Sequence, residues 1–491
     1  MRSNPFVDAP VVIAGAGPVG LSLALGLARH GVRSVVLEKR AEPRPESRAI
    51  ALLPRSLEIL EEWAVLEAVK TEALWTDVLR PLNSDGRPFF EVPLGVLDDV
   101  CSTPAVALLP QSTTERVLME ACQASGLVDL RLGHEVESFA WEGDDVRTWV
   151  KGPEGDLQLV SRYVCGCDGP GSAIRKKLGF ELEGKTYEAS AVLADLRIDD
   201  TRDALEGPRF DIGRSGISFV VRYAPGQWRL VQAMPGRKPD KPRDDLLREA
   251  AALLLGEGPV EIEWMSAFDL HQRSARYYRV ERVMLLGDAA HLNSPSGAQG
   301  MNAGIQDAHN LAWKLAACLQ GADETAFLTS FDEERQDFFW NTVAVESDRY
   351  TQWEVFASPG KRRLVAATLS FMAKFKAGRK KIAKSAGMLT HRHEPSELIG
   401  DSGGQLLPNA KTSVGRLRQA IGPAGGLLVV SGFGREVKVR DQQISVTEGA
   451  AELRALKGRH VVVRPDFVVA YAGNSLAQAQ AWWDLIRGAS E

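Results

Sequence analysis

An acidic residue, a loop of small residues and a helix start follow one another between residues 283 and 319. The four apolar residues 283–286 are typical of a short buried strand, and Gly287 and Asp288 follow them directly. A carboxylate at a strand end can accept hydrogen bonds from sugar hydroxyls, and the unpaired N–H groups of a helix start favour negative charge. The pattern predicts a site for a ligand with a ribitol or ribose and an electron-accepting ring. A structural loop between a core strand and a core helix fits these residues equally well.

A second pattern lies near the amino terminus, where Gly15, Gly17 and Gly20 follow the apolar residues 11–14. Gly15 permits a tight turn, Gly17 lets the backbone approach a pyrophosphate, and Gly20 lets a helix pack closely on a strand. This chemistry requires a strand before the glycines and a helix after them.

Both elements are predicted here. A helix is expected from Pro18 to His30, and its amino terminus would hold the pyrophosphate. A second strand, 32–37, ends at Glu38, which is placed to bind a ribose. Strand, glycines, helix, strand and acid in this order predict a dinucleotide site.

The segment 283–308 resembles the second flavin motif of the FAD-dependent aromatic hydroxylases, which are single-component flavoprotein monooxygenases with the para-hydroxybenzoate hydroxylase fold. The strand at 163–167, followed by Asp168 and Gly169, resembles the third motif of that family, which handles both FAD and NAD(P)H. With the amino-terminal glycines, three motifs occur in the family's order, and the resemblance covers almost the whole chain. It implies FAD as the bound cofactor, with NADPH or NADH as the reductant.

The resemblance also implies roles for individual residues. Gly287 and Asp288 would hold the FAD ribitol, and the loop around Pro295 would face the isoalloxazine ring. The loop lacks the second proline and the paired glycines that the family often has. A helix start near Met301 and Asn302 would stabilise negative charge on the reduced flavin. The further cofactor residues implied by the resemblance are Arg48, Gln111, Asp168 and Gly300.

The fold implied by the resemblance is α/β. A Rossmann-like FAD-binding domain (1–182 and 276–385, the second part with a helical region) is interleaved with a mixed or antiparallel-sheet substrate domain (183–275). A small thioredoxin-like domain follows at 400–491. The last domain contains no cysteine, so thiol redox chemistry is excluded and a structural or dimerising role is expected.

Local patterns support parts of this fold. Residues 217–221 alternate in polarity, and Pro225–Gly226 predicts the turn of a hairpin. Ser112 and Glu115 fit a capping box at a helix start. Residues 361–384 predict a helix with a solvated basic face, although an anionic substrate channel or weak attraction to a membrane surface is also consistent with it.

The sheet of the substrate domain would cover an aromatic substrate. No side chain needs to act as acid or base, and the catalytic residues remain unknown; His271 and Tyr223 are the candidates for deprotonating a phenol. Half of any alternating set faces away from a ligand. The candidate lining residues are Phe219, Arg222, Trp228, Gln232, Met234 and His271.

The implied activity is hydroxylation of a phenol-type or polyketide-type aromatic substrate, with O2 and NAD(P)H consumed through a flavin hydroperoxide. The first alternative is another flavoprotein oxygenase on the same fold, an epoxidase or a Baeyer–Villiger type; a halogenase is disfavoured because residues 21–40 contain no tryptophan. The second alternative is an FAD-binding protein without catalytic turnover.

Composition limits the class further. The chain has 491 residues, a net charge of −5 and no apolar stretch that could span a membrane, so neither a nucleic-acid partner nor integral membrane association is expected. Five cysteines in so long a chain indicate a reducing cytoplasm. Cys165 and Cys167 are interpreted as positions on one strand rather than a metal site. His391 and His393 are expected to be solvated in a polar loop. A homodimer is possible.

Overall fold

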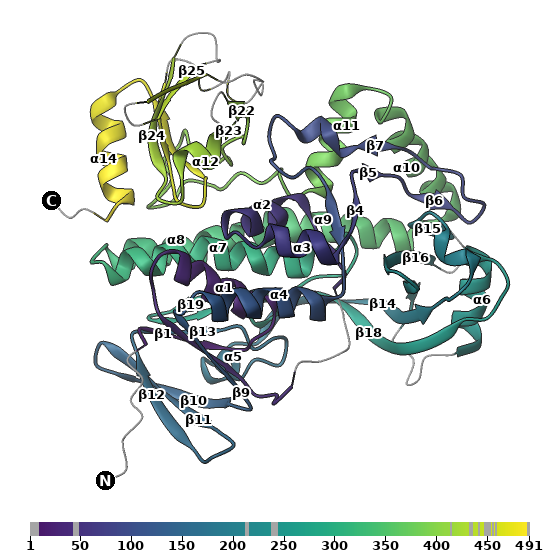
Figure 1. Cartoon of the computed structure of the whole chain (residues 1–491), viewed down its shortest axis with the longest axis horizontal. Coiled ribbons are helices and arrows are strands. Elements are labelled where there is room, and N and C mark those ends of the chain that lie inside the picture. Colours follow the sequence, from purple (N-terminus) through teal and green to yellow (C-terminus); the bar gives the residue numbers. More distant parts are fainter. Residues whose placement is uncertain are drawn as a thin grey trace.

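The computed structural model describes residues 9–42, 49–211, 216–236, 244–412, 415–431, 436–439, 442–445, 453, 456 and 459–488. Three larger sheets organise these residues, and long helices run between them (Figure 1). None of the described helices is both long enough and apolar enough to cross a membrane.

The first sheet has six strands in the order β19-β20-β13-β1-β2-β9. All of its pairs are parallel except β19 with β20. β1, with the sequence Val-Val-Ile-Ala, is fully buried, as a central parallel strand covered on both faces must be. The strands are β1 (Val11–Ala14), β2 (Ser34–Glu38), β9 (Val128–Leu132), β13 (Tyr163–Gly166), β19 (Arg279–Val280) and β20 (Val283–Leu285).

Helices cover one face of this sheet, and a small antiparallel sheet packs near the other. The helices α1 and α7 pack against each other, and α4 lies beside α1. Their apolar sides and the strands form the largest core cluster of the protein. The elements are α1 (Pro18–Arg29), α4 (Gln111–Ala124), α7 (Gln299–Leu319), β10 (Glu135–Glu142), β11 (Asp145–Lys151) and β12 (Leu157–Ser161).

The second sheet has seven strands in the order β21-β18-β14-β17-β16-β15-β6 and is antiparallel except for the pair of β15 with β6. The helix α6 (Asp244–Leu255) packs under one face. The strands are β6 (Leu82–Asn83), β14 (Leu182–Arg197), β15 (Arg209–Asp211), β16 (Ile217–Ala224), β17 (Gln227–Pro235), β18 (Glu261–Ala275) and β21 (His291–Leu292). Because strands of this sheet come from between strands of the first, the predicted interleaved α/β architecture is confirmed.

The third sheet lies in the carboxyl-terminal part, in the order β26-β25-β24-β27-β28, with antiparallel pairs throughout. It packs on α7 and α8 through a shared apolar cluster. The likeness to thioredoxin and the residue boundaries of the domains stay predictions. The elements are α12 (Leu417–Ile421), β22 (Lys411–Thr412), β23 (Gly415–Arg416), β24 (Gly426–Ser431), β25 (Glu436–Val439), β26 (Gln442–Ser445), β27 (His460–Val463), β28 (Val469–Gly473) and α14 (Leu476–Ile486).

A helical region joins the second sheet to the third. The single helix expected at 361–384 is two helices, α10 and α11, separated by a turn at residues 373–375. The helices are α8 (Glu324–Phe338), α9 (Ala344–Thr351), α10 (Pro359–Met372) and α11 (Lys376–Ala386), with π-helical turns η4 (Phe339–Val343) and η5 (Gln352–Phe356).

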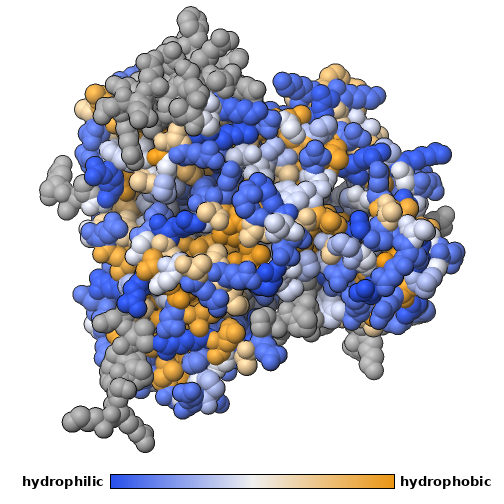
Figure 2. All heavy atoms as spheres, viewed as in Figure 1, coloured by the Kyte–Doolittle hydropathy of each residue, from blue (hydrophilic) through white to orange (hydrophobic). Residues whose placement is uncertain are grey.

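Short elements complete the fold. On the face shown in Figure 2, hydrophilic residues cover most of the surface and hydrophobic ones gather toward the middle. These elements are β3 (Ala51–Leu52), β4 (Leu74–Thr76), β5 (Val78–Leu79), β7 (Val92–Pro93), β8 (Val106–Leu108), α2 (Pro54–Glu62), α3 (Leu66–Glu72), α5 (Ala173–Lys177), η1 (Leu94–Leu97), η2 (Thr201–Ala204) and η3 (Gly287–Ala289).

Candidate functional site: an edge of four strand ends

Four of the predicted cofactor segments meet at one edge of the first sheet. β20, β13, β1 and β2 are adjacent and parallel, so their carboxyl ends lie side by side. Asp288 follows β20, Asp168 follows β13, the glycine pattern begins with Gly15 after β1, and Glu38 ends β2. In open α/β sheets ligands bind outside the carboxyl ends of the strands. The sheet topology therefore gathers residues that lie up to 273 positions apart in the sequence.

Two of the glycines are required by close backbone contacts within the protein. Gly15 has a φ of +104°, and a Cβ there would lie 2.4 Å from the carbonyl oxygen of Cys167. A Cβ on Gly20 would lie 2.0 Å from the carbonyl oxygen of Gly15. These contacts are the tight turn and the close helix packing that the spacing predicts.

Gly17 is different, because no atom of the described residues lies within 4 Å of a Cβ built on it. Gly17 is the N-cap of α1, with Pro18 as the first helical residue, and no side chain caps the helix. No described side chain therefore pairs with the first N–H groups of α1, and an uncapped helix start of this kind is the arrangement that binds phosphate oxygens.

Glu38 and Asp168 border this opening. Glu38 is buried, and its Oε2 accepts from the Ala16 N–H at 3.0 Å while its Oε1 accepts from Arg40. Asp168 Oδ2 accepts from the Ala173 N–H at 2.7 Å, so this carboxylate also caps α5. Asp168 Oδ1 is buried without a hydrogen-bond partner. A ligand hydroxyl would satisfy that oxygen.

Gly287 is held in place by a buried ionic group that the sequence did not reveal. Asp307 of α7 accepts from the Gly287 N–H at 3.0 Å, from His291 Nε2 at 2.7 Å and from Arg335 Nε at 2.7 Å. Burial alone would raise the pKa of Asp307, but His291 and Arg335 lower it to about 2. Asp288, the next residue, extends an exposed side chain from the strand end.

The helix α7 begins at Gln299, two residues before the predicted start near Met301 and Asn302. Its N-cap is Ala298, with a φ of 55° and no capping side chain, so Gly300 and Met301 lie in an uncapped first turn. Asn302 is fully buried: its Oδ1 accepts from the Leu53 N–H at 2.9 Å, and its Nδ2 donates to Ala51 and Ala298. The Asn302 side chain therefore fixes the helix start, and the backbone N–H groups are what a ligand would meet.

Gln111 lies close to this region, although not as the helix pattern predicted. The capping box of Ser112 and Glu115 is wrong, because α4 begins at Gln111 after Pro110 and has no side-chain cap. Gln111 Oε1 accepts from the Ala49 N–H at 3.1 Å, and Gln111 Nε2 donates to Glu115. Arg48 precedes Ala49 and lies outside the described residues.

The loop around Pro295 rests on a second acid missed at the sequence level. Pro295 is exposed, whereas Ser296 beside it is buried and donates to Glu354 Oε2 at 2.6 Å. Glu354 comes from η5 and is buried. Burial raises the pKa of Glu354 to about 7. No sequence pattern links residues 58 positions apart, so this pair could not be predicted.

The two candidate bases lie in different places. His271 is on β18, two residues from Arg273, and Arg273 pairs with Leu292 beside the Pro295 loop. The Nδ1 atom of His271 lies 3.0 Å from Thr186 Oγ1. Tyr223 lies near Arg229, which pairs with Asp195 at the other end of the sheet. The position of His271 on β18 and the position on β18 that pairs with Asp195 are roughly 20 Å apart. Burial, and then Asp195, raise the pKa of the Tyr223 hydroxyl, so the geometry gives no support to Tyr223 as a base.

The candidate lining residues divide between the two faces of the second sheet. Trp228 is fully buried in the cluster under α6, and Arg222 is paired with Asp203 at 2.6 Å, so neither lines the opposite face. On β17, Gln232 and Met234 lie an even number of positions from Trp228, so their side chains point to the same face of the sheet as Trp228. Phe219 is on the other face and stacks on Phe210 at 5.1 Å.

The fold and the edge of strand ends are those of a dinucleotide-binding protein whose first sheet is interleaved with a second, mostly antiparallel sheet. The sequence matches the FAD binding domain family over residues 8–346. It is 34% identical over 341 residues to 12-dehydrotetracycline 5-monooxygenase/anhydrotetracycline 6-monooxygenase of Streptomyces rimosus, covering 66% of each chain, which is just under two thirds of that relative. It is 30% identical to rifampicin monooxygenase of Streptomyces venezuelae over 96% of this chain and 98% of that one.

A solved structure agrees with these relatives. The anhydrotetracycline hydroxylase OxyS of Streptomyces rimosus superposes with a TM-score of 0.77 at 25% identity, covering 97% of this chain and 99% of that one. The chain belongs to the family of FAD-dependent aromatic hydroxylases. FAD fits the site, because Gly17 leaves space beside the uncapped start of α1, and Asp168, which follows the adjacent strand β13, has a buried oxygen without a hydrogen-bond partner among the described residues.

Proposed function

We propose that this protein is a monooxygenase that uses FAD, O2 and NADPH or NADH to hydroxylate a phenol-type or polyketide-type aromatic substrate. The observation that supports it most directly is the edge of four strand ends, where two uncapped helix starts lie with the three acids Glu38, Asp168 and Asp288. Relatives named as monooxygenases of anhydrotetracycline and rifampicin support the substrate class.

The protein's own groups would bind and orient the cofactor. The start of α1 at Gly17 and Pro18 would hold the pyrophosphate, Glu38 a ribose, and Asp288 the ribitol. The bound FAD would supply hydride acceptance and oxygen activation. The uncapped first turn of α7, at Gly300 and Met301, would stabilise negative charge on the ring.

The second sheet would supply the substrate side. Its face opposite α6 carries Phe219 and packs near Trp353 and Val355 of η5, which are close to the Pro295 loop through Ser296 and Glu354. An aromatic, apolar surface of this kind suits a planar ring and keeps water away from the reaction. His271 is the candidate side chain nearest that loop.

The test is oxidation of NADPH and NADH by purified protein with a panel of phenols and aromatic polyketides, with product masses measured under 18O2. We expect one class of aromatic compound to stimulate oxidation and to yield a product that carries one labelled oxygen. A flavin-containing protein whose NAD(P)H oxidation responds to no aromatic compound would contradict hydroxylation. Labelled epoxide or ester products would instead identify an epoxidase or a Baeyer–Villiger oxygenase.

We also propose a cytoplasmic location. All five cysteines are unpaired, which supports a reducing compartment. Light scattering on the same preparation would decide whether the protein forms the homodimer that the carboxyl-terminal part could mediate.

A further inference from the structure

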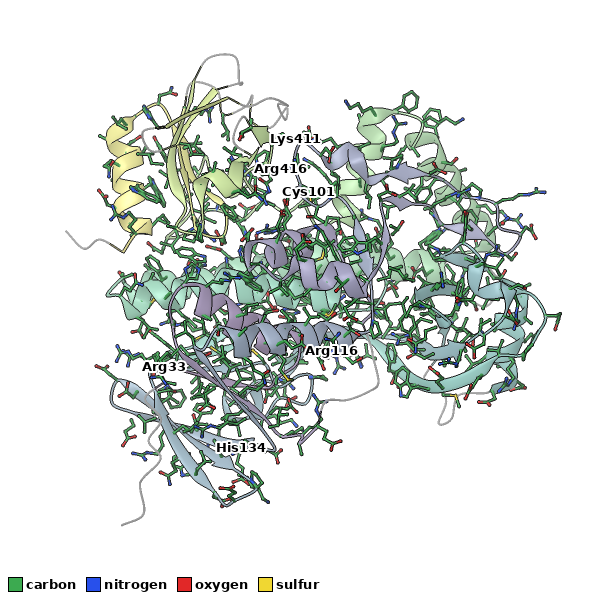
Figure 3. All side chains as sticks on the ribbon, in the orientation of Figure 1. Arg33, Cys101, Arg116, His134, Lys411 and Arg416 are labelled. Atoms are coloured by element: carbon green, nitrogen blue, oxygen red, sulfur yellow. The ribbon has the colours of Figure 1, made fainter. Side chains whose placement is uncertain are left out.

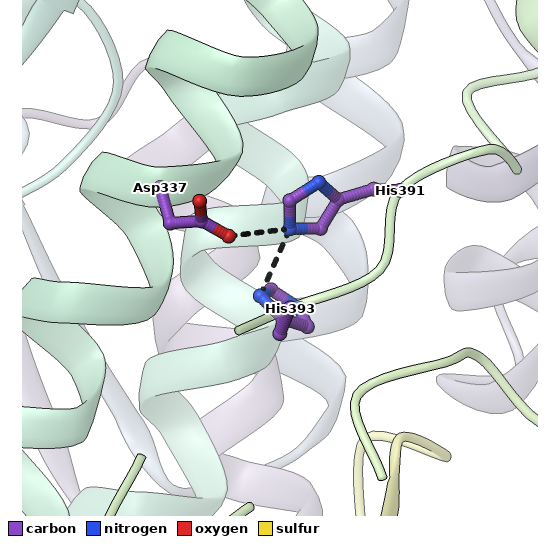
Figure 4. Close-up of side chains that lie close together, drawn as sticks. All are labelled: Asp337, His391 and His393. Atoms are coloured by element: carbon purple, nitrogen blue, oxygen red, sulfur yellow. Dashed lines mark hydrogen bonds and ion pairs between the residues drawn. The ribbon is translucent and has the colours of Figure 1, made fainter. Parts of the chain in front are cut away.

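Two histidines and an aspartate lie together outside the cofactor site, where the segment after α11 crosses α8 (Figure 4). The expectation that His391 and His393 are solvated is wrong, because the side chain of His391 and the residue His393 are each only 9% exposed. They flank Arg392, whose backbone pairs with Gln405. Alternate residues of an extended segment point to the same side, so both imidazoles face Asp337 in the last turn of α8.

The three side chains have the separations of ligands around one ion. His391 Nε2 lies 3.3 Å from Asp337 Oδ2 and 3.0 Å from His393 Nδ1. One ligand atom from each of the three lies within 4.8 Å of the other two. Zinc bonds of about 2.0–2.2 Å in tetrahedral geometry place neighbouring ligand atoms about 3.4 Å apart. A small movement of these side chains would therefore bring all three to bonding distance.

The surrounding groups orient the ligand atoms. Thr342 Oγ1 lies 2.7 Å from His391 Nδ1, which fixes the ring and directs Nε2 toward the other two residues. Asn341 donates to Asp337 Oδ1 at 2.5 Å, and Asp337 Oδ2 is a buried oxygen without a well-directed donor.

Space and charge also allow an ion. Both histidines line a cavity of about 50 Å³ between α7, α8 and the carboxyl-terminal part. A water molecule needs roughly 10–15 Å³, so a fourth ligand can be water. The nearby cations are already balanced: Arg335 pairs with Asp307 at 2.7 Å, and Arg464 pairs with Glu334 at 2.6 Å.

We propose that Asp337, His391 and His393 bind one divalent transition-metal ion, with zinc as the best match to two imidazoles and a carboxylate. The ion would tie α8 to the segment that leads into the carboxyl-terminal sheet. Without an ion, the same residues form the hydrogen-bonded chain of Figure 4. The site is independent of the FAD chemistry, and in the described part of the chain it is the one cluster with this ligand geometry.

The first test uses the full-length protein with its flavin, treated with a chelator, dialysed and titrated with ZnCl2 by calorimetry. We expect one equivalent to bind with micromolar or tighter affinity and to remain after gel filtration when measured by elemental analysis. We also expect zinc to raise the Tm and MgCl2 to leave it unchanged, because magnesium prefers all-oxygen sites. No stoichiometric zinc at micromolar free metal would overturn the proposal, whatever the flavin content.

The second test uses variants. His391→Ala and Asp337→Asn each remove one ligand, and we expect at least a tenfold loss of zinc affinity with unchanged FAD content. The matched control is His134→Ala, because His134 lies beside β10, far from this site (Figure 3). Zinc binding that persists in both ligand variants would overturn the proposal, and so would an equal loss in His134→Ala. If a variant fails to fold, the titration of the unaltered protein still decides.

Discussion

Two buried acids, one beside Gly287 and one beside the Pro295 loop, differ in their pKa and in the residues that they position. Asp307 is ionised between His291 and Arg335 and positions Gly287, whereas Glu354, whose pKa is raised to about 7, supports the Pro295 loop through Ser296. Burial raises the pKa of both carboxyl groups, and only Asp307 has partners strong enough to reverse the effect. Replacing each acid by its amide is therefore expected to change the stability of the protein in a different way.

Asp307→Asn keeps the shape of the side chain and removes the charge. Arg335 would then be left buried without its carboxylate, which costs about 3–5 kcal/mol for a broken buried pair. We expect the free energy of unfolding to fall by that order and FAD to be lost more easily, because Gly287 loses an acceptor. Urea unfolding and the flavin-to-protein ratio measure both. A variant with unchanged stability would contradict the assigned role.

Glu354→Gln should change how stability depends on pH. Its pKa is about 7 in the folded protein against 4.5 in the unfolded chain, so the native state holds a proton that the unfolded state releases. The stability of the unaltered protein therefore falls as the pH rises from about 4.5 to 7, by at most about 3 kcal/mol, and is level above that.

The glutamine variant cannot ionise, so its Tm relative to the unaltered protein should rise by a few degrees between about pH 5 and pH 8. Thermal unfolding at the two pH values checks this. The control is Glu397→Gln, which alters an exposed carboxylate. A Tm difference that does not vary with pH would show that Glu354 does not titrate in this range.

At the scale of elements, the carboxyl-terminal sheet is attached to the rest by buried charges. Arg464 is fully buried and donates to Glu334 of α8 at 2.6 and 2.8 Å and to Asp466. Lys314 of α7 lies 3.1 Å from the same glutamate. On another side of the carboxyl-terminal part, Lys411 and Arg416 reach Asp98 near the buried Cys101 (Figure 3).

Arg464→Ala should loosen this attachment. Two carboxylates would remain buried beside one lysine, and we expect a loss of about 3–5 kcal/mol in the free energy of unfolding. The FAD content of the folded protein should be unchanged, because these residues are not among those placed at the strand ends. Arg487→Ala, an exposed arginine on the same carboxyl-terminal part, is the control. An Arg464 variant as stable as that control would show that the cluster contributes no net stability.

How far the sequence predicts these features depends on the range of the interaction. The Gly15–Gly20 pattern, Glu38 and the strand at 283–285 are local, and the structure places them as predicted. Asp307 meets His291, Glu354 meets Ser296 and Arg464 meets Glu334 across 16, 58 and 130 positions, so these pairs come together only through packing. A short alternating strand does not indicate which face meets a ligand, and of the candidate lining residues Trp228 lies on the face under α6. The polar segment around His393 gives no sign of its packing against α8, so its burial could not be predicted.

At the scale of the whole molecule, the first sheet supplies the edge of strand ends, and strands of the second sheet come from between its strands in the sequence. The central claim is that the uncapped start of α1 holds the FAD pyrophosphate. A substitution at Gly17 can test binding apart from folding, because a Cβ there meets no atom of the described residues, whereas a Cβ on Gly20 would lie 2.0 Å from the backbone. Gly360 likewise has nothing within 4 Å of an added Cβ, and it lies on α10, away from the edge of strand ends.

The most direct measurement is therefore the flavin-to-protein ratio and the Tm of Gly17→Val, Gly360→Val and the unaltered protein, each after incubation with excess FAD and gel filtration. We expect the unaltered protein and Gly360→Val to hold about one FAD per chain, and Gly17→Val to be folded but colourless. A folded Gly17→Val protein with a full complement of FAD would contradict the account.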